Sequence, residues 1–375
     1  MKKQEGFSLI ELLVTMAVFV IVIAAAVGIF VPLVNQFKQQ SKIAETNIEG
    51  IIGLELLRLD MAHAGYGLPW FYPGTLAGYN EASSFPASTY NDTASNPPRS
   101  ILSGNNMAFA APNNIFDGTD YLVIKSTAVA ASDASQRWSY RTGTNPPRVW
   151  GVEDFAATDR VIFINPKASE TRLRELVISG GAFSTTYSAP FTPAETLETY
   201  LIYGVDPDTN LQRPFNRADY FIWRGSADPA TDDVPDRCAP NTGVLRKAVV
   251  NHSAGTFQGG ILPLLDCVAD MQIIFGLDND GDGDFEPVVS TDGWSEDITA
   301  LTAQQVRDQV KEIRVYILAH EGQMDLTYTY PTQILSLGGD IGLGRNYDLA
   351  AGIGANWQNY RWKVYTLVVR PENLR

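Results

Sequence analysis

The chain has 375 residues, enough for one large domain or two ordinary ones. With 45% hydrophobic and 19% charged residues it has the composition of a globular protein, which excludes disorder for most of its length. The formal net charge of −14 argues against general binding to nucleic-acid phosphates, which requires basic patches. We therefore expect no nucleic-acid partner.

The N-terminus combines two lysines with a long apolar run. Lys2 and Lys3 come first, and the 23 residues from Leu12 to Val34 include no charged residue. At about 1.5 Å of rise per residue, such a helix spans the ~30 Å hydrocarbon core of a membrane. Glu11 lies at the start of this apolar side, where an unpaired carboxylate costs roughly 2.5–3.5 kcal/mol. A residue this costly usually has a function.

Two interpretations leave part of this pattern unexplained. A secretory signal peptide would use Ala24-Ala25-Ala26 as its cleavage site, but the apolar run continues beyond it to Val34, and Glu11 is unusual in such a segment. A plain transmembrane anchor explains the length of the run. It does not explain Glu11.

The stretch Gly6-Phe7-Ser8-Leu9-Ile10-Glu11-Leu12-Leu13-Val14 closely resembles the processing site of type IV prepilins and pseudopilins. The resemblance implies that prepilin peptidase cuts after Gly6 and N-methylates the new first residue, Phe7. It also implies that Glu11, at the fifth mature position, pairs with the terminal amine of a neighbouring pilin or pseudopilin.

The same resemblance implies a location. Before assembly the chain would cross the inner membrane once, with Lys2 and Lys3 holding the N-terminus in the cytoplasm. The C-terminal domain would then lie in the periplasm, and after assembly on a pilus at the cell surface.

Beyond the membrane segment, apolar residues recur at helical spacing and predict an amphipathic continuation of the helix. Gly50 and Gly53 weaken this part by up to ~1 kcal/mol each but allow close packing. We expect a leader at 1–6 and a pilin helix at 7–64, whose membrane half is 7–35 and whose amphipathic half is 36–64.

The rest of the chain changes character twice. Residues 65–119 are rich in Gly, Pro, Ser and Asn, which predicts an irregular surface insertion. From 120 to 375, short β-branched and aromatic runs bounded by turn residues predict a β-rich globular domain. A short helix begins after Thr302, which forms a capping box with Gln305. The expected fold is α+β, a long N-terminal pilin helix followed by a large antiparallel β-rich pilin-like domain.

Two stretches near the C-terminus, Pro263–Asp278 with its acidic continuation and Arg361–Leu374, resemble the PilW-like minor pilins. This resemblance implies a minor pilin that is assembled into the type IV pilus or primes it, with other major and minor pilins. The alternatives are a minor pseudopilin of a type II secretion system and a pilin-mounted adhesin or DNA-uptake receptor.

An acidic loop at 278–286 is the strongest candidate for metal binding. Aspartates at positions 1, 3 and 5 and glycine at position 6 are typical of the start of a calcium loop. Position 12 is Val289 instead of glutamate, so a full EF-hand is not expected, and Glu286, Asp292 or Glu296 would have to complete the ligand shell. The candidate ligands for a structural Ca²⁺ are Asp278, Asp280, Asp282, Asp284 and Glu286. The alternative is a solvated acidic turn.

The two cysteines, Cys238 and Cys267, fit one disulfide in an exported protein better than a metal site. Two free buried thiols are the alternative. The three histidines, His63, His252 and His320, are scattered and are expected at surface or capping positions. The sequence has no Ser/His/Asp signature, phosphate loop or zinc motif, so we expect no enzymatic activity.

Overall fold

We describe the fold from a computed structural model. It describes residues 8–108, 114–191, 195, 197–206, 210–225, 234–257, 261–288 and 292–374. The expected leader at 1–6 and the first residue after it, Phe7, lie outside the described residues.

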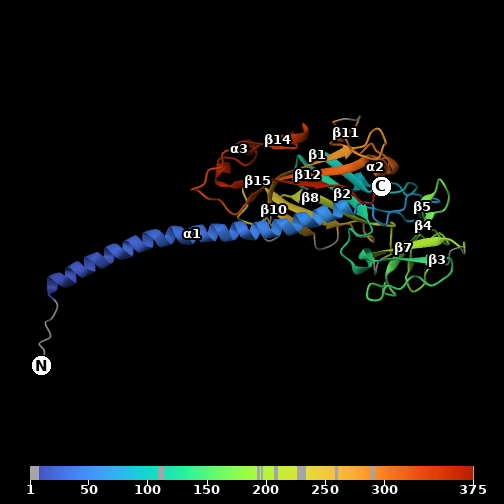
Figure 1. The fold of residues 1–375 in the computed structure, drawn as a ribbon, viewed down its shortest axis with the longest axis horizontal. Coiled ribbons are helices and arrows are strands. Elements are labelled where there is room, and N and C mark those ends of the chain that lie inside the picture. The colour runs from blue at the N-terminus through green and yellow to red at the C-terminus, as the bar shows by residue number, and fades with distance from the viewer. Residues whose placement is uncertain are drawn as a thin grey trace, which may run out of the picture.

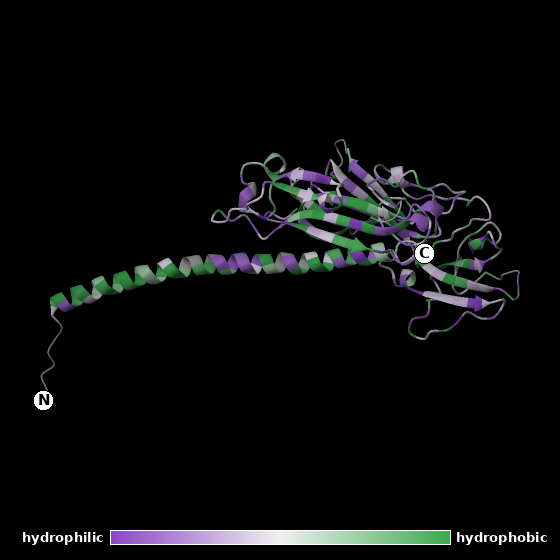
Figure 2. Cartoon of the chain, turned by 45° about the horizontal axis from the view of Figure 1, so that its top comes forward, coloured by the Kyte–Doolittle hydropathy of each residue, from purple (hydrophilic) through white to green (hydrophobic). Residues whose placement is uncertain are grey.

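A single helix, α1 (Leu9–Ala62), leads from the N-terminal end into a β-rich body, and its first half projects away from that body (Figure 1). Residues Leu9–Phe30 are long and apolar enough to cross a membrane, and none of the apolar stretch is buried against the rest of the chain. Figure 2 shows this half as almost continuously hydrophobic and the second half as mixed. The apolar N-terminal helix expected from the sequence is thus confirmed.

The larger of the two main sheets has eight strands, all paired antiparallel. Its order is β1 (Ile101–Met107), β2 (Thr119–Ser126), β8 (Asn216–Trp223), β9 (Gly243–Val249), β10 (Leu262–Leu277), β12 (Val310–Glu321) and β15 (Arg361–Val369), with β11 (Gly293–Ser295) beside β10.

Core side chains pack on both faces of this sheet, since successive side chains of a strand point to opposite sides. On β12, Val315 and Ile317 face the second half of α1, whereas Tyr316 and Leu318 face the other way. The far face is covered in part by a hairpin, β13 (Ile334–Leu337) and β14 (Arg345–Asp348), and by α3 (Leu349–Gly352). The short helix α2 (Ala303–Gln309) begins with the expected capping box.

A second sheet lies at the end of the body opposite the free end of α1 (Figure 1). Its order is β3 (Trp138–Thr142), β7 (Thr199–Asp206), β4 (Arg160–Lys167) and β5 (Leu173–Leu176), with β6 (Thr185–Thr186) beside β4. The confirmed fold class is therefore α+β, with the β-rich part divided between these sheets.

The segment 65–119 differs from the expected surface insertion. Its residues 101–107 form β1, an edge strand of the main sheet. Tyr72, Leu76 and Tyr90 are buried although they lie outside regular strands. The composition of the segment does not predict this strand or these buried side chains, because both depend on contacts with distant parts of the chain.

Candidate functional site

The start of α1 is built by its own sequence. Ser8 is the N-cap: its Oγ accepts a hydrogen bond from the backbone N–H of Glu11 at 3.3 Å, and the Glu11 carboxylate accepts one from the Ser8 backbone N–H at 3.1 Å. This is a capping box, which satisfies two helix N–H groups that would otherwise be unpaired. The sequence analysis missed this second role of Glu11, although the Ser-x-x-Glu spacing signals it.

The position of Glu11 suits a partner outside the chain. It lies in the first helical turn, where the helix dipole favours a negative charge. Its side chain is exposed. The two predicted processing residues, Gly6 and Phe7, lie outside the described residues, so the structure places only Glu11 of the three.

The second half of α1 is fixed to the body by close packing. Leu57 and Met61 are fully buried in the main core. At position 53 a Cβ atom would overlap the backbone carbonyl of Leu264 on β10, so only glycine permits this approach. At Gly50 a Cβ would meet only the end of the Leu265 side chain, at 2.8 Å. The helix therefore contacts the backbone of β10 directly.

A buried ion pair fixes the end of the helix as well. The Asp60 carboxylate accepts hydrogen bonds from Lys247 Nζ at 2.6 Å and from the Tyr220 hydroxyl at 2.5 Å. Burial raises the pKa of Asp60 above its usual value, while Lys247 acts in the opposite direction. The helix is thus joined to β8 and β9 through a polar contact inside an apolar core.

The acidic loop places three carboxylates together. Oxygen atoms of Asp278, Asp280 and Asp292 lie within 4.8 Å of one another. Backbone N–H groups of Gly281 and Gly283 donate to Asp278 at 2.6 and 3.0 Å, which folds the loop around that side chain.

The remaining predicted ligands of the loop do not belong to this three-carboxylate group. Asp282 accepts a hydrogen bond from the backbone of Asp284 at 3.0 Å. Glu286 donates its backbone N–H to Asp292 at 2.9 Å. Glu296, considered as a completing ligand, instead accepts the backbone N–H of Gly344. The group that could hold an oxygen-seeking cation therefore contains two of the five predicted ligands, Asp278 and Asp280, together with Asp292.

The electrostatics of the loop also suit a cation. The hydrogen bond from the Asp282 backbone lowers the pKa of Asp280, but burial and the carboxylates of Asp282, Asp292 and Asp278 raise it, and its pKa lies above the usual value. Lys311 Nζ lies 3.5 Å from Asp278 and offsets part of this repulsion.

Cys238 and Cys267 form the expected disulfide, across 29 residues of sequence. His320 lies beside it and is buried, with its pKa lowered to about 3 by burial. His252 is also buried, and its Nε2 lies 3.0 Å from Asn216 Oδ1. The expectation of surface or capping positions holds for His63, the C-cap of α1, and is wrong for the other two.

A buried ionic network ties residues 81–92 to the main sheet. Lys125 Nζ lies 2.7 Å from carboxylate oxygens of both Glu81 and Asp92. Arg217 contacts Glu81 at 3.0 Å and Asp219 at 2.7 Å. The network was not predicted from the sequence. The only feature of the sequence that indicated it was the presence of basic residues, Lys125 and Arg217, inside otherwise apolar strands.

Comparison with known proteins identifies one feature. Residues 1–27 match the family described as the prokaryotic N-terminal methylation motif. Neither the curated proteins nor the solved structures include a match to the chain. The motif supports cleavage by prepilin peptidase and assembly with other pilins. The chain therefore carries the N-terminal methylation motif of type IV pilin-like proteins, on an apolar helix consistent with a single-pass membrane anchor.

Proposed function

We propose that this chain is a minor pilin of a type IV pilus, PilW-like, which enters or primes the filament as part of an initiating or tip complex. The observation that carries the proposal is the methylation motif on a helix that runs without interruption from the apolar span into the body. The size of the body supports a minor role, because a bulky domain repeats poorly along a filament shaft. In this proposal the chain is a structural subunit and not an enzyme, and its body lies in the periplasm before assembly.

The assembly step follows from the first turn of α1. After cleavage behind Gly6, the amine of Phe7 in one subunit becomes the partner of Glu11 in its neighbour. A carboxylate in lipid is costly, and pairing with an ammonium group offsets that cost. Until a neighbour arrives, the Ser8 capping box satisfies part of the hydrogen-bonding capacity of Glu11.

Two substitutions at one position separate pairing from capping. Glu11→Gln keeps a side chain that completes a capping box but removes the charge. Glu11→Val removes both. We expect both variants to insert into the membrane and to be at least about tenfold depleted from sheared pili, since tenfold corresponds to ~1.4 kcal/mol, within the cost of an unpaired carboxylate.

Immunoblots of the sheared and membrane fractions measure this effect. Normal incorporation of Glu11→Gln would refute the pairing role. Sequencing of the mature protein should begin at N-methylated Phe7. Recovery of the chain in a pseudopilus, and not in surface pili, would instead favour the type II secretion alternative, which shares the motif.

We further propose that the acidic loop binds a structural Ca²⁺ through Asp278, Asp280 and Asp292. The proximity of their carboxylates supports this ligand set. Calcium supplies a charge that relieves the repulsion among them, and it accepts six to eight oxygen ligands, so backbone carbonyls or water would complete the shell. A dependence of thermal stability on calcium tests the proposal.

A further inference from the structure

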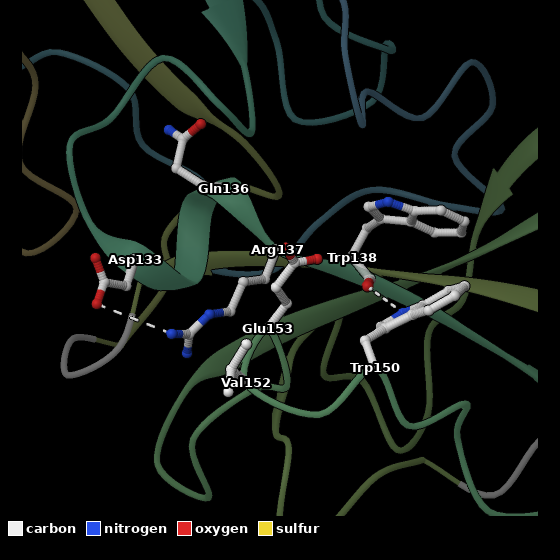
Figure 3. Close-up of a pocket in the computed structure, with 7 residues that line it drawn as sticks. All are labelled: Asp133, Gln136, Arg137, Trp138, Trp150, Val152 and Glu153. Carbon is white, nitrogen blue, oxygen red and sulfur yellow. Dashed lines mark hydrogen bonds and ion pairs between the residues drawn. The ribbon is translucent and has the colours of Figure 1, made fainter.

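The second sheet carries an open cleft of about 550 Å³ at its β3 edge (Figure 3). The 3-10 turn Asp133–Gln136 leads into β3 on one side, and residues 150–153 of the loop after β3 form the other. Its volume falls in the range of small-ligand sites, ~300–1,000 Å³. Trp138 and Trp150 are 41% and 39% exposed, which is unusual for side chains whose burial is so favourable.

We infer that this cleft binds a sugar ring of a neutral glycan. The inference rests on the proposed function, because a subunit displayed at the end of a pilus is placed to meet surface polysaccharide.

The tryptophans form a supported aromatic platform. Their ring centroids lie 5.4 Å apart. Two further side chains pack on Trp150: the Arg148 guanidinium lies 5.4 Å from its ring centroid, and the Tyr140 ring lies 6.3 Å away. Among the rings that the structure describes, only Trp150 lies against Trp138, which leaves Trp138 as the surface for a ligand.

The platform is formed before any ligand arrives. The indole N–H of Trp150 donates to the backbone carbonyl of Trp138 at 3.0 Å, and its backbone N–H donates to Asp154 at 2.5 Å. Ser139 Oγ also donates to the carbonyl of Arg148 at 2.8 Å. A loop held by these bonds loses little freedom on binding, which favours affinity.

The lining suits a sugar in both its apolar and polar parts. A pyranose ring has an apolar C–H face, which packs on an indole, and hydroxyl groups around its edge. Arg137, Asp133 and Glu153 provide charged donors and acceptors beside the rings. Figure 3 shows the two indoles on one side and the Asp133–Arg137 pair, 3.9 Å apart, on the other.

Charge selects among ligands. Two carboxylates and one guanidinium line the cleft, and Arg137 is also engaged by Asp159 at 3.6 Å. The excess of negative charge disfavours sulfated, phosphorylated or sialylated ligands. Val152 is the one aliphatic side chain among the residues that the structure places in the lining, which disfavours a lipid or an apolar peptide segment.

The test uses the purified full-length chain in a polyoxyethylene detergent, which has neither a sugar nor a choline headgroup to compete. The probe is an array of neutral hexose and N-acetylhexosamine oligosaccharides, with sulfated and sialylated versions of the same backbones. We expect binding to at least one neutral oligosaccharide and weaker binding to its sulfated version. Binding only to charged glycans, or to none at millimolar concentration, would overturn the inference.

Variants test the residues. Trp138→Ala removes the platform but keeps the backbone carbonyl that holds Trp150, so the loop stays anchored. It should weaken binding by about tenfold or more, as expected for a central tryptophan. Glu153→Gln should weaken binding less. Leu326→Ala is the control: this exposed residue does not line the cleft, so its replacement should leave glycan binding unchanged.

Two results separate this inference from the proposed function. Equal glycan affinity in Trp138→Ala and the unmodified chain would refute the cleft. Loss of pilus incorporation in Trp138→Ala, with glycan affinity unchanged, would identify the exposed tryptophans as a subunit contact instead. Since glycan binding is measured on the purified chain, failure of the Glu11 experiment leaves this result unaffected.

Discussion

At the scale of single residues, Asp120 is the clearest titrating group of the core. It lies buried on β2 and accepts backbone hydrogen bonds from Asn106 at 2.8 Å and Ile273 at 2.7 Å. Burial, with a smaller contribution from the nearby Asp270 carboxylate, raises its pKa, and these hydrogen bonds lower it; the net result is a pKa of about 7. The folded protein therefore binds a proton at a pH where the unfolded chain, with the ordinary pKa of 3.8, does not.

This difference predicts a pH dependence. Because the folded state holds the extra proton, the contribution of Asp120 to stability is fully present below pH ~4 and is lost as the pH rises through about 7. Urea unfolding of the unmodified chain and of Asp120→Asn at pH 5, 6, 7 and 8 measures it. We expect the stability of the unmodified chain relative to the variant to rise as the pH falls from 8 to 5. Parallel profiles would contradict the assignment.

At the scale of elements, the contact of α1 with β10 depends on glycine. Gly53→Ala should raise helix propensity by up to ~1 kcal/mol, but overlap with the Leu264 carbonyl should cost more, ~1–3 kcal/mol for overpacking. Gly50→Ala is the matched control, because the end of the Leu265 side chain can move. Unfolding followed by tryptophan fluorescence should show a lower free energy of unfolding for Gly53→Ala than for Gly50→Ala. Equal values would mean that the helix can move away from β10 at little cost.

Two elements show which structure local sequence patterns predict and which they do not. The helix after Thr302 was predicted with its cap, because a capping box is formed by residues three positions apart. The strand β1 was not predicted, because residues 101–107 contain Gly104, Asn105 and Asn106, which are poor strand formers. Pairing with β2 overrides this weak local preference.

At the scale of the whole molecule, calcium should stabilise the body. With a Kd of about 10⁻⁴–10⁻³ M, the range of extracellular calcium modules, ~10 mM Ca²⁺ should add about 1.4–2.7 kcal/mol to the free energy of unfolding. Thermal unfolding with calcium and with a chelator measures the effect. Asp280→Asn should abolish the increase, whereas Asp308→Asn, outside the loop, should keep it. No increase in the unmodified chain would leave the loop as a solvated acidic turn.

The whole body also depends on contacts that local sequence does not specify. Lys125, Arg217 and Glu81 are fully buried, and each is compensated by residues from distant segments. A buried charge without a partner is strongly destabilising, so these positions require the complete network. Glu81 and Asp92 join segment 65–100 to the main sheet through this network.

The sequence by itself determined five features of this protein: the apolar helix, the methylation motif, the position of Glu11, the α+β class and the pairing of the only two cysteines. These features depend on neighbouring residues or on simple counts. Only the tertiary structure decided the division into two sheets, the buried ionic network, the grouping of Asp292 with the acidic loop, and the cleft at Trp138 and Trp150. Each of these brings together residues from separate elements, and such contacts depend on long-range packing that local propensity does not encode.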